Sequence, residues 1–132
     1  MSTIKFIDTK THGYLDYLVS VALIAAPWVL DFYRDGAETW LPVILGVGTI
    51  VYSLLTDYEL GVSRQISMRK HLMLDLFSGV ILGISPWLFG FADYVWAPHL
   101  ILGILEIGVA LMTRTAPDTE GKVRTSRRVH LR

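Results

Sequence analysis

Two histidine–aspartate pairs are the residues whose types and spacing could do chemistry in this sequence. His12 and Asp16 form the first pair, and His71 and Asp75 form the second. Residues four apart lie on the same face of a helix, so each histidine can reach its own aspartate. If the two pairs met, imidazole and carboxylate could bind a divalent metal ion or relay protons. We favour a structural interpretation, in which each aspartate complements the positive end of a helix and the histidine hydrogen-bonds to it.

Glu106 is the only charged residue between positions 95 and 113. If that segment is a transmembrane helix, Glu106 lies about 15 Å from Trp96, near the bilayer centre. A charge there costs at least roughly 2.5–3.5 kcal/mol. A protonated or hydrogen-bonded packing group is slightly favoured over a proton or ion site. His99, Gly103 and Ala110 share its helix face, and we expect few polar groups opposite, so no continuous wet path is predicted.

A proline–tryptophan motif follows each histidine–aspartate pair. The prolines remove a backbone hydrogen bond to the carbonyl four residues earlier, and so kink or end a helix. In the second copy Ser85 or a neighbouring helix could satisfy that carbonyl. We favour a break that turns the chain at the membrane surface over a broken helix that lines a binding site. The motif residues are Pro27, Trp28, Ser85, Pro86 and Trp87.

The chain contains these motifs twice. Histidine, aspartate, proline and tryptophan recur at an offset of 59 (12 to 71, 16 to 75, 27 to 86, 28 to 87). Ile44-Leu-Gly46 then matches Ile101-Leu-Gly103, and Thr56 matches Thr113, at an offset of 57. A long fixed period indicates one supersecondary unit used twice. We predict a first repeat over about 12–58 and a second over about 71–115.

The Ser-Pro-Trp at 85–87, its partner Ala-Pro-Trp at 26–28 and the flanking His-x-x-x-Asp pairs resemble the SPW repeat family of small bacterial membrane proteins. The resemblance covers nearly the whole chain, and the first copy departs from it by Ala26 in place of serine. It implies a helical bundle embedded in a membrane. It implies no established reaction and supplies no catalytic residue.

Composition and hydropathy point to the same class. Apolar residues make up 52% of the chain and charged residues only 18%, against roughly 25% charged in a typical soluble domain. Zero net charge gives no overall electrostatic basis for nucleic-acid binding, and the absence of cysteine removes thiol chemistry. Apolar segments span 14–32, 40–56, 72–92 and 95–113, each long enough to cross most of a bilayer. We predict an all-α, four-helix transmembrane bundle.

The distribution of basic residues predicts the orientation. Eleven of the twelve Lys and Arg lie in the amino-terminal segment, the 57–71 loop and the carboxyl-terminal segment. Only Arg34 lies in the other connections. The positive-inside rule then places both termini in the cytoplasm, with two parallel-oriented helical hairpins and a basic tail at 116–132. Trp28, Trp40, Trp87 and Trp96 fall at the opposite interface.

These features favour a single membrane domain over residues 1–132, in a bacterial inner (cytoplasmic) membrane, with a structural or interaction role and no enzymatic activity. A subunit role, a homo-oligomer or a membrane-protein partner would fit the short loops. The lipid bilayer is the expected environment, and no cofactor, resident metal or nucleic acid is predicted. The alternative is a small proton, ion or solute transport unit that uses Glu106 and the histidine–aspartate pairs.

Overall fold

Four helices make up the fold. The computed structural model describes residues 5–115, and within them the helices are α1 (Thr9–Val29), α2 (Ala37–Leu54), α3 (Met68–Leu88) and α4 (Ala97–Met112). In this part of the chain the only β pairings are two isolated bridges. The predicted all-α class with four helices is therefore confirmed. The predicted tail at 116–132 lies outside the described residues.

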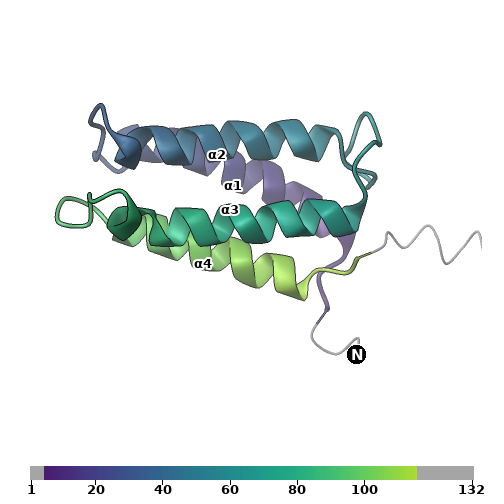
Figure 1. Cartoon of the computed structure of the whole chain (residues 1–132). Helices are drawn as coiled ribbons and strands as arrows, with labels where there is room; N and C mark the ends of the chain where they lie inside the picture. The colour runs from purple at the N-terminus through teal and green to yellow at the C-terminus, as the bar shows by residue number, and fades with distance from the viewer. Residues whose placement is uncertain (1–4, 116–132) are drawn as a thin grey trace, which may run out of the picture.

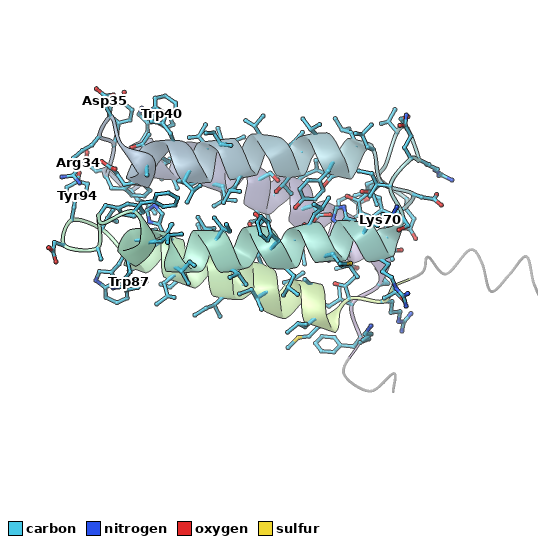
Figure 2. All side chains as sticks on the ribbon, in the orientation of Figure 1. Arg34, Asp35, Trp40, Lys70, Trp87 and Tyr94 are labelled. Atoms are coloured by element: carbon cyan, nitrogen blue, oxygen red, sulfur yellow. The ribbon has the colours of Figure 1, made fainter. Side chains whose placement is uncertain are left out.

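The helices form two hairpins (Figure 1). α1 packs against α2 and α3 against α4, while α2 contacts α3 across the middle. One end of the molecule holds the loop 55–67 and the starts of α1 and α3; we call it the basic end. The other holds the connections 30–36 and 89–96, and we call it the tryptophan end. Figure 2 shows Lys70 at the basic end and Trp40 and Trp87 at the tryptophan end.

α1 and α3 begin four to five residues before the apolar segments predicted at 14 and 72. The side chain of Asp8 accepts a hydrogen bond from the N–H of Thr11, at 2.7 Å, and so caps α1. That same backbone N–H lowers the pKa of the Asp8 carboxyl. Ser67 caps α3 through the N–H of Lys70, at 3.2 Å. Because the first turn of each helix is polar, hydropathy alone starts both helices too late.

α1 and α3 end two residues after their prolines, in the same way. The N–H of Phe32 donates to the carbonyl of Pro27 at 2.9 Å, and the N–H of Phe91 donates to that of Pro86 at 2.8 Å. Between them the chain takes positive φ, at Asp31 (56°) and Gly90 (75°). This left-handed turn closes each helix and sends the chain into the next connection.

Ser85 satisfies the carbonyl that Pro86 leaves free. Its hydroxyl donates to the carbonyl of Leu82 at 2.7 Å, and Ser85 is fully buried. Alanine occupies the matching position of the first half, so that half has no such hydroxyl. The serine therefore stabilises one helix end by its own side chain and is not needed in the other.

Small residues set the spacing within each hairpin. A Cβ added at Gly79 in α3 would lie 2.9 Å from the carbonyl oxygen of Gly103, and one added at Gly103 would lie 2.6 Å from that of Gly79. In the other hairpin, a Cβ at Gly46 would lie 2.8 Å from the carbonyl oxygen of Ser20. The Cβ of an alanine at Gly83 would meet only the Cα of Gly103, at 3.8 Å. A Cβ at Gly103 would, however, lie 2.6 Å from the backbone nitrogen of Gly83, so Gly79, Gly83 and Gly103 all belong to the close approach of α3 and α4.

The interior is more polar than the surface of the helices. Among the described residues, nine apolar side chains are buried, against fifteen polar or charged ones. Large apolar side chains instead cover the outside of all four helices; examples are Leu18, Ile44, Phe77 and Ile101, each more than 60% exposed. By length and composition α2 and α3 can each cross a membrane, and only 33% of the α2 window and 50% of the α3 window is buried. α4 is apolar but shorter.

Candidate functional site

The two histidine–aspartate pairs meet at the basic end. His12, Asp16, His71 and Asp75 can each offer one ligand atom such that all four atoms lie within 4.8 Å of one another. All four residues are buried, with 7% exposure or less. We call these four residues the His/Asp cluster. The cluster lies in the second and third turns of α1 and α3. Because its two members are four residues apart, each pair presents both side chains to the other helix.

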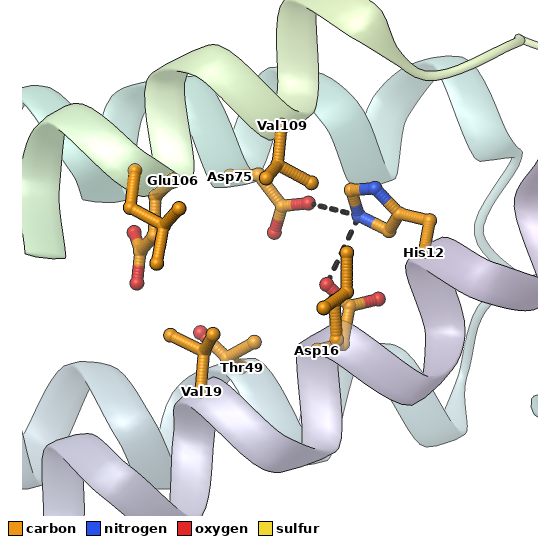
Figure 3. A pocket seen from close by; sticks show the side chains of 9 residues that line it. His12, Asp16, Val19, Thr49, Asp75, Glu106 and Val109 are labelled. Carbon is orange, nitrogen blue, oxygen red and sulfur yellow. Dashed lines mark hydrogen bonds and ion pairs between the residues drawn. The ribbon is translucent and has the colours of Figure 1, made fainter. Parts of the chain in front are cut away.

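Each histidine contacts the aspartates of both halves. His12 Nε2 lies 3.0 Å from Asp16 Oδ1 and 2.7 Å from Asp75 Oδ2. His71 Nε2 lies 2.9 Å from Asp16 Oδ2 and 3.1 Å from Asp75 Oδ2. Figure 3 shows the contacts of His12. The cluster therefore connects α1, the first helix of one hairpin, with α3, the first helix of the other.

Two threonines bind the Nδ1 atoms of the two histidines. Thr113 Oγ1 lies 2.7 Å from His12 Nδ1, and its hydroxyl donates to the carbonyl of Val109 at 2.6 Å. A hydroxyl has one proton, so Thr113 must accept from His12 Nδ1–H. Thr56 holds His71 in the same way, at 2.7 Å from Nδ1, while donating to the carbonyl of Tyr52 at 2.6 Å. Each histidine is thus held by a threonine of the other half.

Two short backbone pairings hold these threonines. The N–H of Ile7 donates to Met112 O at 3.1 Å and that of Arg114 to Ile7 O at 3.0 Å, on either side of Thr113. The matching pairing flanks Thr56, because Ile66 N–H donates to Leu55 O at 2.8 Å and Asp57 N–H to Ile66 O at 2.7 Å.

Two tyrosines complete the shell around the carboxylates. Tyr58 donates to Asp16 Oδ2 at 2.9 Å, and Tyr52 donates to Asp75 Oδ1 at 2.5 Å. Tyr58 comes from the loop 55–67 and is 1% exposed, and its burial raises the pKa of the phenol. Both hydroxyls therefore act as donors. Sequence reasoning missed all four of these partners, although the match of Thr56 with Thr113 was a usable signal.

Glu106 lies outside the cluster but shares a cavity with it (Figure 3). The cavity measures about 50 Å³ and is lined by His12, Leu15, Asp16, Val19, Thr49, Asp75, Leu105, Glu106 and Val109. That volume has room for a few water molecules. Glu106 Oε2 is buried without a hydrogen-bond partner in this part of the chain. The expectation of few polar groups opposite Glu106 was therefore wrong on the side that faces the cluster, because α1 and α3 turn their aspartates toward it.

Toward the tryptophan end, the surface between α1 and α4 becomes apolar. A second cavity there is lined by Ala22, Ala25, Ala26, Val29, Leu30, Ala97, Pro98, Ile101 and Leu102. None of these side chains offers a polar group, so the polar residues that line the cavity beside Glu106 have no polar continuation along this groove.

His99 is buried separately, at the tryptophan end. Its Nε2 donates to the carbonyl of Glu38 at 2.8 Å. Its ring lies between Phe32 and Phe91, the residues that follow the two helix-ending turns, with centroids 5.1 and 4.8 Å away. His99 therefore packs the two hairpins together where their chains reverse.

The connections at the tryptophan end are joined by Arg34. Its Nε donates to Glu38 Oε1 at 2.8 Å, and its guanidinium carbon lies 3.5 Å from the centroid of the Tyr94 ring. Figure 2 shows Arg34 and Tyr94 together at this end. The single basic residue of these connections is thus engaged in contacts within the protein. All four tryptophans lie at this end and are between 42% and 56% exposed.

The comparisons with known proteins support one assignment. The model of the SPW repeat domain matches residues 10–113 of the chain. Curated proteins and solved structures gave no match. The matched range contains the whole His/Asp cluster and both threonines that hold it.

Proposed function

Because this chain belongs to the SPW repeat family, we propose that it is an integral protein of the bacterial cytoplasmic membrane that crosses the bilayer four times. The family supports a membrane protein, and the apolar α2 and α3 support membrane-spanning helices. The side-by-side arrangement of the four helices supports the two remaining crossings, by α1 and α4.

The observation that carries this proposal is the reversed distribution of polarity. A water-soluble domain buries apolar side chains and exposes polar ones. Here the buried set is mostly polar, and large apolar side chains cover the helices. Exposed apolar surface of this extent needs lipid or protein to cover it. Internal partners for polar groups are also what a bilayer demands, since it offers no water to replace them.

The two ends support an orientation. The loop 55–67 and the residues around it carry Arg64, Arg69 and Lys70, whereas Arg34 at the other end is paired with Glu38. The positive-inside rule favours the basic end as the cytoplasmic one. The four half-exposed tryptophans at the opposite end suit the outer interface, where amphipathic rings are favoured.

Within the membrane we propose a structural or interaction role. The polar groups at both ends bind each other across the two hairpins, and the connections at the tryptophan end are short. This arrangement builds a rigid apolar body with little surface outside the bilayer. Such a body suits a subunit that packs against a membrane protein or a second copy through its helices.

Reporter fusions and membrane extraction test this proposal. The protein should remain with the membrane after alkaline extraction. Fusions at Arg132 and in the 57–71 loop should read cytoplasmic, and a fusion at Gly36 should read external. A carboxyl terminus outside the cytoplasm would overturn the orientation, and release by alkali would overturn membrane integration.

A second candidate is proton or ion transport, favoured by the cavity that joins Glu106 to the His/Asp cluster. The apolar lining of the groove toward the tryptophan end weighs against a continuous path. Proton leak of liposomes that contain the purified protein separates the two candidates. No leak above that of protein-free liposomes leaves the structural role, and a leak that is lost in Glu106→Gln establishes transport.

A further inference from the structure

We propose that His12, Asp16, His71 and Asp75 form a binding site for one divalent transition-metal ion of the zinc type. The proposal goes beyond the structural role and does not depend on it. It rests on the side chains of the cluster, on the groups that orient them and on their charge.

The threonines present the correct atom of each histidine. Because Nδ1–H donates to Thr113 in His12 and to Thr56 in His71, a neutral ring carries its lone pair on Nε2. Both Nε2 atoms face the two carboxylates. Metal-binding histidines are typically fixed in this way, by a hydrogen bond from the ring nitrogen that does not bind the ion. The tyrosine hydroxyls on Asp16 and Asp75 serve the carboxylates similarly.

His71 gives a second, independent observation. Its Nε2 is fully buried and makes no hydrogen bond within the described residues. Yet it lies 2.9 Å from Asp16 Oδ2 and 3.1 Å from Asp75 Oδ2. The nitrogen is therefore close to one oxygen of each carboxylate without hydrogen-bond geometry to either of them. An atom placed between the carboxylates would receive its lone pair.

The dimensions of the cluster fit a small ion after a small rearrangement of the ligand atoms. Zinc bonds of about 2.0–2.1 Å in a tetrahedron place neighbouring ligand atoms about 3.3 Å apart. The four nitrogen–oxygen contacts of the cluster range from 2.7 to 3.1 Å. The four candidate ligand atoms lie within 4.8 Å of one another, so zinc binding requires the short contacts to widen by a few tenths of an ångström and the most widely separated atoms to approach. The cavity on the Glu106 side places room for a few water molecules directly beside the cluster.

Charge and ligand chemistry select the ion. Two neutral imidazoles and two carboxylates carry two negative charges in a buried site, and a divalent cation balances them. Two imidazole nitrogens favour zinc and its first-row neighbours over Mg²⁺ and Ca²⁺, which prefer sites made of oxygen alone. Two bound protons would also balance the charge, so a metal-free cluster that holds two extra protons is the competing state.

Zinc binding to the full chain tests the site directly. The protein is purified in detergent, stripped with a chelator and titrated with Zn²⁺ by calorimetry, in a background in which His130 is replaced by glutamine to remove the histidine outside the described residues. We expect about one Zn²⁺ per chain, a rise in melting temperature on binding, and no comparable response to Mg²⁺. A folded, stripped protein that binds no Zn²⁺ would overturn the proposal and leave the metal-free cluster that holds two extra protons.

Variants then locate the bound ion. His71→Gln should abolish binding, and Thr56→Val or Thr113→Val should weaken it by about 10–100-fold, as loss of an orienting partner does. Thr39→Val is the matched control, because Thr39 is equally buried but lies at the tryptophan end, where it accepts from the N–H of Arg34. It should bind Zn²⁺ like the parent. Unchanged affinity in His71→Gln and in both threonine variants would place the ion elsewhere and refute the site.

Discussion

The two ends of this molecule both bury histidine, but they use it differently. At the basic end, two histidines and two aspartates from both halves contact one another, and each half supplies equivalent partners. At the tryptophan end, the single histidine bonds a main-chain carbonyl and packs between two phenylalanines. The basic end buries two carboxylates beside two histidines, whereas the one buried carboxylate described at the tryptophan end, that of Glu38, is paired with Arg34. We therefore expect ion or proton binding at the basic end, and a packing role for the histidine at the tryptophan end.

The largest effect should come from removing one carboxylate of the cluster. Asp75 contacts both histidines and accepts from Tyr52. Asp75→Ala should lower the free energy of unfolding by about 3–5 kcal/mol, because it leaves buried polar groups without a partner. Unfolding in detergent, followed by circular dichroism, measures it. Asp93→Ala, at an exposed position near the tryptophan end, is the control and should change little. Equal stability of both variants would refute the role of the cluster.

The next effect concerns the close approach of α3 and α4, which runs between the two ends. Gly79→Leu must push against the backbone of Gly103, and should cost about 1–3 kcal/mol of unfolding free energy. A Cβ at Gly108 meets nothing within 4 Å, so Gly108→Leu is a matched control on α4. Melting temperatures in detergent measure both. If Gly79→Leu melts like the control, the face of α3 that carries Gly79 is not packed on α4.

A smaller effect is expected at the tryptophan end. His99→Phe keeps an aromatic ring between Phe32 and Phe91 but loses the hydrogen bond to Glu38. It should cost about 1 kcal/mol and leave Zn²⁺ affinity unchanged. The same titration and unfolding experiments measure both quantities. A loss of Zn²⁺ binding in this variant would mean that the two ends are not independent.

The smallest effect should follow from Glu106→Gln. Glutamine keeps the volume and hydrogen-bonding capacity of the side chain but cannot ionise. We expect unfolding free energy to change by less than about 1 kcal/mol, and no proton flux in either protein. Liposomes with an entrapped pH-sensitive dye measure the flux. A leak in the parent that disappears in Glu106→Gln would establish the transport candidate.

Much of the fold could be predicted from the sequence, because long apolar segments and paired proline motifs mark the helices. Hydropathy could not find the helix starts, since Asp8 and Ser67 cap polar first turns. The residues of the cluster were also predictable from their repeated spacing. The contact of each histidine with the aspartate of the other repeat was not predictable. Spacing within a helix shows which residues share a face, but not which other helix that face packs against.

The surrounding shell was harder to predict. Thr56 and Thr113 lie just beyond the helices they follow, and Tyr58 lies in a loop with no periodic pattern. Their contacts depend on how the loop 55–67 folds back over α1 and α3. The cavity beside Glu106 depends in the same way on how all four helices come together around it, which the sequence of any one helix does not specify. The predicted domain limits and the predicted site roles remain predictions.

A double-mutant cycle between the two halves tests the central claim most directly, that they are joined through the His/Asp cluster. His12→Gln and Asp75→Asn are made singly and together, and unfolding free energies are compared in detergent. We predict a coupling energy above about 1 kcal/mol, since the two side chains are in contact at 2.7 Å. His99→Gln with Asp75→Asn, which lie at opposite ends, should be additive within about 0.5 kcal/mol. Additivity of the His12 and Asp75 variants would contradict the contact and the account built on it.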